Sequence, residues 1–234
     1  MVEAIPEMKN QRFILAAGCG LAFGAAFANT GLVLKTGTSV SHLTGDISRL
    51  SIDFFRATPA IYSEIARITT AFLAFIFGAF AAGLLIHHPT LNISRPYGRI
   101  ITGIGLLFLV AFAILTQAPV AGIALAAFGC GLQNALATRY RGLILRTTHL
   151  TGLATDFGIT LGMRVKGYHI PTWKIAVPAL LLISFSLGGL SSAAVSFFCP
   201  LDPIFISGLA YVSVGIFWSI YKHVFLPPNK KKSS

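Results

Sequence analysis

Six long apolar stretches constrain this chain more than any other feature of its sequence. Each has enough residues to cross the hydrocarbon core of a bilayer, which takes about 20 residues as an α-helix. The stretches run approximately over 12–34, 61–86, 98–117, 119–140, 174–198 and 202–226. Charged residues make up only 11% of 234, whereas a soluble domain carries about 25%. We therefore expect an all-α integral membrane protein.

The net charge of +11 does not indicate a nucleic-acid partner. The basic residues lie between the apolar stretches and at the termini, where the positive-inside rule expects them. Lys230-Lys231-Lys232 follows Pro227-Pro228, and we interpret it as a topology anchor near anionic lipid. The sequence thus predicts a multi-pass membrane protein with both termini in the cytoplasm.

The first apolar stretch has an alternative interpretation as a cleaved signal peptide. Lys9 and Arg12 precede it, and Ala26-Phe27-Ala28 resembles a signal-peptidase site. The stretch has a counterpart deep in the chain, however, and this favours its belonging to the fold.

Two segments between the apolar stretches, 39–56 and 147–163, are too polar for lipid-facing spans but are helical in pattern. Apolar residues recur in both at helix spacing: Leu43, Ile47, Leu50 and Phe54 in the first, and Leu150, Ala154, Phe157 and Leu161 in the second. These two apolar stripes match at a constant offset of 107 residues. We expect two re-entrant or broken half-helices in addition to six transmembrane helices.

The constant offset indicates an internal repeat. Ser41-His42-Leu43-Thr44-Gly45 corresponds to Thr148-His149-Leu150-Thr151-Gly152, and Gly24-x4-Asn29 corresponds to Gly129-x4-Asn134. The two five-residue segments are called the motif segments below. We divide the chain into a cytoplasmic N-terminal segment (1–11), membrane repeat A (12–117), membrane repeat B (119–226) and a basic cytoplasmic tail (227–234).

The distribution of positive charge favours inverted repeats. If each motif segment enters and leaves on one side, each repeat has three spans, and fourteen of the 18 Lys and Arg residues are cytoplasmic. If both motif segments cross the membrane, the protein has eight spans in parallel repeats, and about eleven of these residues are cytoplasmic. We expect the six-span arrangement with two inverted repeats.

The motif segments are the candidate substrate site. A helix that ends within a membrane exposes free N–H groups and a partial positive charge, which suit an anion or a polar substrate. In inverted-repeat transporters such helix ends meet near the midplane. We expect substrate contacts at Ser41, His42, Thr44, Gly45, Thr148, His149, Thr151 and Gly152. The alternative is that these hydroxyls and glycines serve only helix packing.

The two motif histidines are open to several roles. His42 and His149 are candidates for binding substrate, carrying protons or ligating a metal, and the alternative is a satisfied bond between helices. Two histidines without clustered cysteines or carboxylates make a poor metal site. The three cysteines, Cys19, Cys130 and Cys199, indicate neither a disulfide framework nor metal-ligand spacing. We therefore expect no metal and no cofactor.

Three ionisable residues of these segments are candidates for charge or proton coupling, because ionisable groups at membrane depth are costly. The repeat places Asp156 at the position of Arg49, so the two either pair or leave Asp156 to titrate. The alternative is that Asp46 and Arg49 bond to each other at the outer interface, at i, i+3. Glu64 and Arg67 have the same spacing and are interpreted as an interfacial pair.

One asparagine in an apolar helix precedes each motif segment. We expect Asn29 and Asn134 to bond to the broken backbone of the motif segments or to line a pathway, with packing as the alternative.

At these residues the sequence resembles the YoaK family of bacterial membrane proteins, known as domain of unknown function 1275. The resemblance rests on Ser41-His42-Leu43-Thr44-Gly45 with Arg49-Leu50, on 146–152 with Thr155-Asp156, and on Gly131-Leu132-Gln133-Asn134-Ala135. It covers roughly 12–226 and implies a multi-pass protein of the bacterial inner membrane without an established substrate. Asn29 departs from the family pattern, in which an aspartate is common, and this argues against a proton-carrying role there.

The first functional hypothesis is a small transporter or channel-like permease for a small anion or polar metabolite, in the lipid bilayer and with a homo-oligomer left open. The second is a membrane-embedded enzyme acting on a lipid or lipid-linked substrate, with a histidine and an aspartate as acid and base. No nucleophile or metal constellation supports an enzyme, and we expect no catalytic residue. The third is a non-catalytic scaffold or sensor.

Overall fold

The computed structural model describes residues 4–56, 61–85, 97–136, 139–140, 143–144 and 148–225. In these residues it has eight α-helices and one short antiparallel β-hairpin. The elements are α1 (Ala4–Thr36), α2 (Leu43–Arg56), α3 (Ile61–Leu85), α4 (Tyr97–Ile114), α5 (Pro119–Ala135), β1 (Arg139–Tyr140), β2 (Leu143–Ile144), α6 (Leu150–Val165), α7 (Thr172–Phe198) and α8 (Pro203–Phe225). The predicted basic tail over 227–234 lies outside the described residues.

Five helices are long and apolar enough to cross a membrane: α1 from Arg12, α3, α4, α7 and α8. The prediction of a multi-pass helical membrane protein is therefore confirmed. The sixth apolar helix, α5, has 17 residues, and at 1.5 Å per residue it measures about 25 Å against about 30 Å of hydrocarbon. The predicted span over 119–140 is wrong at its end, because α5 stops at Ala135 and Arg139–Tyr140 pair with Leu143–Ile144 instead.

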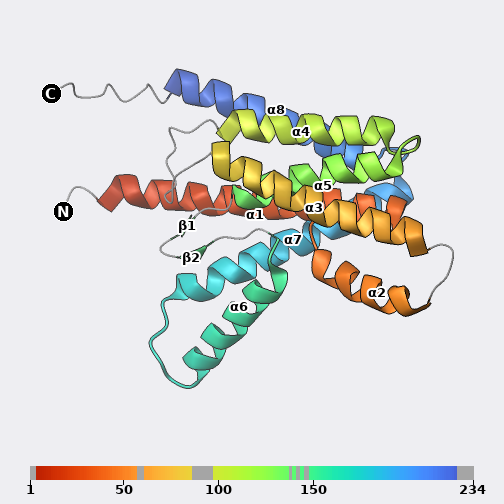
Figure 1. Ribbon diagram of the computed structural model, residues 1–234. Helices are drawn as coiled ribbons and strands as arrows, with labels where there is room; N and C mark the ends of the chain where they lie inside the picture. The colour runs from red at the N-terminus through yellow and green to blue at the C-terminus, as the bar shows by residue number, and fades with distance from the viewer. Residues whose placement is uncertain are drawn as a thin grey trace.

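The apolar helices form a bundle (Figure 1). Helices α2 and α6, which follow the two motif segments and are called the motif helices below, project away from this bundle. Helix α4 packs along α8, α3 along α5, and α7 along α1. Helix α2 packs against α3, and α6 packs against α7. The N-terminal end of α1 and the C-terminal end of α8 lie at the same side of the molecule.

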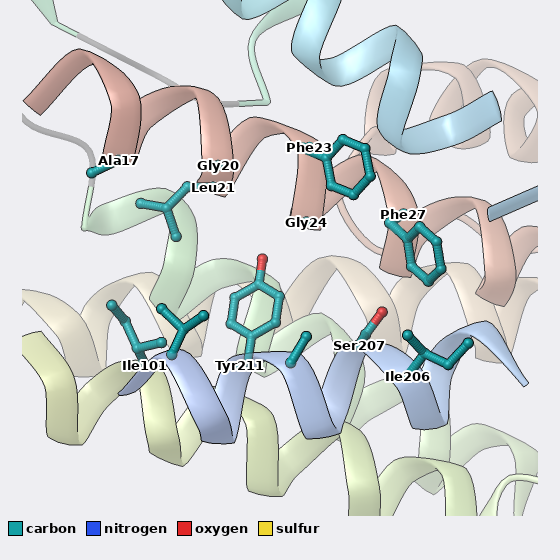
Figure 2. A pocket seen from close by; sticks show the side chains of 12 residues that line it. Ala17, Gly20, Leu21, Phe23, Gly24, Phe27, Ile101, Ile206, Ser207 and Tyr211 are labelled. Carbon is teal, nitrogen blue, oxygen red and sulfur yellow. The ribbon is translucent and has the colours of Figure 1, made fainter. Parts of the chain in front are cut away.

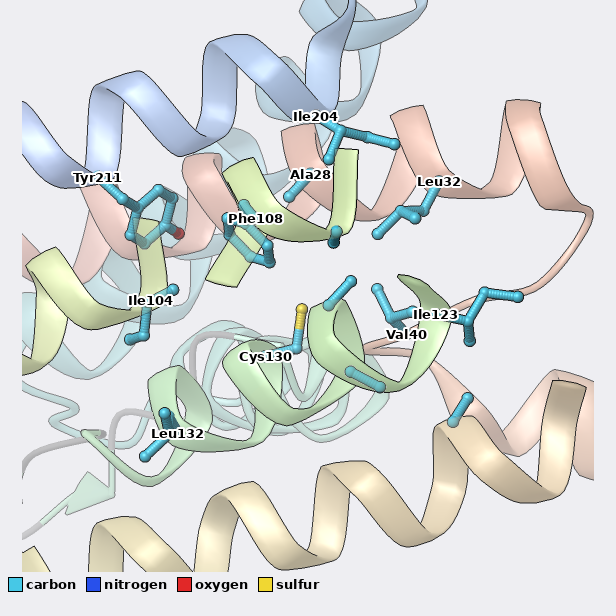
Figure 3. Packing of buried hydrophobic residues seen from close by; sticks show 14 of the residues in the cluster. Ala28, Leu32, Val40, Ile104, Phe108, Ile123, Cys130, Leu132, Ile204 and Tyr211 are labelled. Atoms are coloured by element: carbon cyan, nitrogen blue, oxygen red, sulfur yellow. The ribbon is translucent and has the colours of Figure 1, made fainter. Parts of the chain in front are cut away.

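The bundle core combines small residues with a few large side chains. Phe108 and Ile104 of α4, Ile123 of α5, Leu32 of α1 and Ile204 of α8 are fully buried and face one another (Figure 3). Alanines and glycines fill the positions between them. Because lipid gives apolar helices no hydrophobic reason to associate, close van der Waals packing of this kind holds a membrane bundle together.

Glycines mark the closest helix contacts. A Cβ at Gly78 of α3 would overlap the carbonyl of Phe128 in α5, and a Cβ at Gly188 of α7 would overlap the carbonyl of Phe23 in α1. Between α4 and α8, Gly98 faces Gly215.

Further along the same pair of helices, Gly105 faces Gly208. The earlier glycine of α4 thus meets the later glycine of α8, and the later glycine of α4 meets the earlier glycine of α8. The two helices therefore run antiparallel.

The end of α1 sets the start of the first motif segment. Gly37 has a φ of 69°, which favours glycine, and its N–H donates to the carbonyl of Val33 at 2.8 Å. Two residues earlier, Lys35 forms an ion pair with Asp202. Asp202 also accepts the N–H of Ile204 at 2.7 Å and so caps α8. These contacts join the C-terminal end of α1 to the N-terminal end of α8.

Candidate functional site

A single side-chain oxygen organises the linker between α1 and α2. Oδ1 of Asn29, in α1, accepts three hydrogen bonds: from Oγ of Ser39 and the N–H of Val40, both at 2.9 Å, and from the N–H of Ser41 at 3.1 Å. Ser39, Val40 and Ser41 are buried. Buried backbone N–H groups outside a helix require such partners. Asn29 thus bonds to the backbone of the motif segment, one of the two roles predicted for it.

Ser39 connects this linker to the first turn of α2. Its Oγ accepts the N–H of His42 at 2.9 Å, and its own N–H donates to Oδ2 of Asp46 at 2.8 Å. Burial raises the pKa of Asp46, while the Ser39 N–H and the charge of Arg49 oppose this rise. A carboxylate in the first turn also suits the partial positive charge of a helix N-terminus.

An asparagine also holds the start of the second motif segment. Oδ1 of Asn134, near the end of α5, accepts the hydroxyl of Thr148 at 2.8 Å. Thr148 is buried and directly precedes His149, as Ser41 precedes His42. In each half, an asparagine of an apolar helix therefore binds the first residue of the motif segment.

The two motif segments meet at His42. Its imidazole lies beside the backbone of Thr148 and packs edge-on against Phe185 of α7, with ring centroids 4.8 Å apart. Helices α2 and α6 begin near this point and diverge from it (Figure 1). Two helix N-termini thus lie close to one imidazole.

The His42 ring has one bound nitrogen and one open nitrogen. Nδ1 lies 2.9 Å from Oγ of Ser41. Nε2 is buried, and within the described residues no atom completes a hydrogen bond to it. His42 lies in the linker, outside the helices long enough to span a membrane. Burial lowers its pKa, and the Thr148 backbone opposes this in part. An imidazole nitrogen beside a backbone group in this way can also donate to, or accept from, a small polar ligand.

His149 has different surroundings from His42. It is exposed at the N-cap of α6, and its ring lies over the backbone of Gly152, where a Cβ would be 2.5 Å from Nδ1. At Gly45, the equivalent glycine, a Cβ would meet no atom within 4 Å. Only Gly152 is thus required for the position of the histidine ring. Thr44 and Thr151 are exposed in the first turns of α2 and α6.

The charged candidates do not gather around His42. Arg49 pairs with Glu64 of α3 at 2.7 Å and lies 3.8 Å from Asp53, one turn further along α2. Asp156 is exposed on α6. The structure thus gives Arg49 partners from its own repeat and no ion pair with Asp156 among the described residues.

Glu64 and Arg67 also have different partners from those expected. Glu64 pairs with Arg49, whereas Nη1 of Arg67 donates to the carbonyl of Thr36 at 3.2 Å. Nη1 of Arg49 approaches the neighbouring carbonyl of Gly37 at 3.5 Å. Two cations therefore face the C-terminal end of α1, where their charge interacts favourably with the partial negative charge of the helix end.

Several residues of this region were missed from the sequence. Ser39 has no counterpart in the other motif segment, and the roles of Ser39 and Phe185 depend on packing between distant segments. Gln133 is fully buried, donates to the carbonyl of Leu21 at 2.7 Å and accepts the hydroxyl of Tyr211 at 2.6 Å. Its position beside Asn134 in an apolar helix was the signal that would have identified it.

In the part of the chain that the structure describes, no three His, Cys, Asp or Glu side chains gather as metal ligands would. Among the comparisons with known proteins, the family described as "Protein of unknown function (DUF1275)" matches residues 17–217. This match includes both motif segments and both asparagines. No significant match to the chain was found among curated proteins or among solved structures.

Proposed function

We propose, from the premise that this chain belongs to the DUF1275 family, that it is a small membrane transporter or channel-like permease. Its substrate is a small anion or a polar metabolite, and the substrate site lies between the N-terminal ends of α2 and α6. The observation that carries the proposal is the position of His42 of the first motif segment, whose ring packs against Phe185 of α7 at 4.8 Å between centroids and lies beside the backbone of Thr148 of the second motif segment.

The chemistry of this point suits a small polar or anionic solute. The N-terminus of an α-helix exposes N–H groups and about half a positive charge, and two such ends converge here. Nε2 of His42 has no partner among the described residues, and Thr44 and Thr151 present hydroxyls in the first turns of both helices. Irregular backbone is tolerated at membrane depth where protein or water surrounds it, and Asn29 and Asn134 supply such protein contacts.

An arrangement of two inverted repeats, 12–117 and 119–226, is the second part of the proposal. It is supported by glycine contacts that occur twice. In the proposed repeat, α3 corresponds to α7 and α5 corresponds to α1. Gly78 of α3 meets Phe128 of α5, and the equivalent Gly188 of α7 meets the equivalent Phe23 of α1.

The helices α4 and α8 give the orientation of this exchange. Gly98 of α4 is equivalent to Gly208 of α8, and Gly105 of α4 is equivalent to Gly215 of α8. Exchanging the two helices therefore turns the contact of Gly98 with Gly215 into the contact of Gly208 with Gly105. These equivalent helices run antiparallel, and a two-fold axis that relates antiparallel helices is perpendicular to them. For helices that cross a bilayer, such an axis lies in the membrane plane, as in inverted-repeat transporters.

Inverted repeats would put the motif helices α2 and α6 on opposite sides of one site. In this proposal α2 reaches the site from the outer face and α6 from the cytoplasmic face. Ser41, His42, Thr148 and His149 contact substrate, and Gly45 gives access to the backbone of α2. Arg49 with Glu64 fixes α2 against α3, and exposed Asp156 is the residue left to exchange protons.

Flux measurements test the proposal. The purified protein is reconstituted in liposomes, and uptake of labelled chloride, phosphate, sulfate and small carboxylates is followed together with proton flux. We expect saturable uptake of at least one solute, reduced at least tenfold by His42→Ala and unaffected by His169→Ala, an exposed histidine outside the site. Flux equal to that of empty liposomes for all these solutes, or equal flux in both variants, contradicts the proposal.

A further inference from the structure

A groove of about 320 Å³ lies between α1 and α8, away from the motif segments (Figure 2). Phe23 and Phe27 of α1, Val214 of α8 and Ile101 of α4 are among its lining residues. Phe23 and Val214 are exposed at the surface of the bundle. Since α1 and α8 are both long enough to span a membrane, the medium outside the groove is the acyl-chain region of the bilayer.

Contacts between α1 and α8 close both ends of the groove. At one end the ring of Phe13 stacks on Trp218, with centroids 5.0 Å apart. At the other end Gly31 packs against Pro203, and the ion pair of Lys35 with Asp202 follows one turn later. A ligand therefore enters sideways, from the bilayer.

The polar atoms of the lining already have partners. The hydroxyl of Tyr211 points across the groove floor towards α1 (Figure 2) and donates to Oε1 of Gln133. The hydroxyl of Ser207 donates to the carbonyl of Pro203 at 2.8 Å. An ordered water requires two or more polar partners, and an apolar cavity without them takes an apolar ligand. The lining thus selects a hydrocarbon group.

One glycine accounts for the opening. A Cβ at Gly20 would meet no atom within 4 Å. At the offset that relates Asn29 to Asn134, the counterpart of Gly20 in α5 is Leu125, whose side chain packs against the core. The interface of α5 with α4 is filled by such side chains, whereas that of α1 with α8 is open at Gly20.

The length of the groove matches the hydrocarbon thickness of one leaflet, and a cation lies beyond one of its ends. Its lining on α1 runs from Ala17 to Phe27, about 15 Å of helix and half of the roughly 30 Å hydrocarbon core. Beyond the stacked pair of Phe13 and Trp218, exposed Arg12 begins the membrane span of α1. A cation at that level suits the phosphate of a lipid whose chain lies in the groove.

We propose that this groove binds one acyl chain of a membrane phospholipid, with the phosphate beside Arg12. The lipid belongs to the leaflet nearest the N-terminal end of α1. The site is independent of the substrate site proposed above, and its occupancy does not require transport.

A photoreactive phosphatidylglycerol with a diazirine in its acyl chain tests this site in vesicles that contain the full chain. We expect labelling to concentrate on peptides covering 17–27 and 206–214. Gly20→Leu fills the groove and should reduce this labelling at least fivefold. Gly83→Leu, at an exposed glycine of α3 with equally open surroundings, should leave it unchanged. Circular dichroism and gel filtration check that both variants fold.

If Gly20→Leu does not fold, Ala210→Leu fills the groove from α8 and serves in its place. Arg12→Gln should weaken labelling by the phospholipid probe but not by a photoreactive alkane. Labelling spread evenly over all apolar helices, or equal in the Gly20→Leu and Gly83→Leu variants, overturns the proposal. A cross-link of the groove to a second copy of the chain in place of lipid also overturns it, as does labelling by the phospholipid that is equal with and without Arg12.

Discussion

At the scale of single residues, Asn29 contributes most to the candidate site. One carboxamide oxygen accepts three donors from three consecutive residues, so a polar linker is held within an apolar bundle. An aspartate at this position would keep this function, because a carboxylate oxygen accepts the same hydrogen bonds.

Replacing Asn29 by alanine should destabilise the protein by about 2–4 kcal/mol, because partly buried donors lose their only acceptor. Asn29→Asp should recover more than half of this loss, since it restores the acceptor. Unfolding by sodium dodecyl sulfate in mixed micelles measures both changes. Asn134→Ala, which removes the one bond to Thr148, is the matched comparison and should cost less. An Asn29→Ala protein as stable as wild type would show that the linker does not depend on this oxygen.

His42 should make stability depend on pH. Its pKa lies below the ordinary value of 6.5 because the ring is buried. The unfolded chain therefore binds more protons than the folded protein as the pH falls through 6.5, and folding stability decreases in that direction. The raised pKa of Asp46 has the opposite effect at lower pH, so it does not account for a loss near pH 6.

Unfolding midpoints at pH 7.5, 6.5 and 5.5 measure this dependence. His42→Gln should flatten the decrease, whereas His169→Gln, at an exposed position, should leave it as in wild type. An unchanged pH dependence in His42→Gln would mean that the imidazole is protonated as easily in the folded protein as in the unfolded chain.

The residue-level predictions of substrate contact stay predictions, and the structure adds the surroundings of each residue. The repeat identified His42 and His149 as equivalent, and both do lie at the start of their motif helices. Their surroundings differ, because Phe185 packs on His42 whereas Gly152 lies under the ring of His149. Contacts of this kind depend on side-chain orientation and on a helix distant in the sequence, which a motif does not encode.

At the scale of elements, periodicity predicted the helices well and their ends less well. The polar segments over 39–56 and 147–163 were expected to be helical, and α2 and α6 begin later, at Leu43 and Leu150. The delay in the first has a physical cause, since the N–H groups of Val40 and Ser41 are bound by Asn29 instead of helix carbonyls. The spacing Gly24-x4-Asn29 indicated an important asparagine, but only the fold shows that Asn29 binds the backbone of the linker.

Glycine contacts decide how closely the helices approach. Gly188→Ala should destabilise the protein by about 1–3 kcal/mol, because its Cβ meets the Phe23 carbonyl and α7 must shift away from α1. Gly83→Ala, with open surroundings, should be neutral or slightly stabilising through helix propensity. The midpoint of thermal unfolding in detergent compares the two. Equal midpoints would indicate that α1 and α7 pack loosely at this level.

At the scale of the whole molecule, hydropathy predicted the class of protein because a chain with so few charges has little alternative to lipid. The repeat offset also indicated which helices correspond. The sequence did not indicate the short α5 or the groove at Gly20, since both depend on how neighbouring helices fill space. In the proposed repeat, the open interface of α1 with α8 corresponds to the filled interface of α5 with α4.

The orientation of the repeats can be tested with single cysteines. Cys19, Cys130 and Cys199 are replaced by alanine, and one cysteine is introduced at Ser51 of α2 or at Lys166 after α6, both exposed positions. If the repeats are inverted, the ends of α2 and α6 face opposite sides of the membrane. If α2 and α6 both cross in parallel repeats, these two positions face the same side.

A membrane-impermeant maleimide applied to intact cells distinguishes the two arrangements. We expect the cysteine at position 51 to react from outside and the cysteine at position 166 to react only after the membrane is permeabilised. An introduced cysteine that reacts only in the denatured protein shows that its position is buried, and the neighbouring exposed residue is then used. Reaction of both cysteines from one side would reject the inverted arrangement. That result would also reject the proposed approach of α2 and α6 to one site from opposite faces of the membrane.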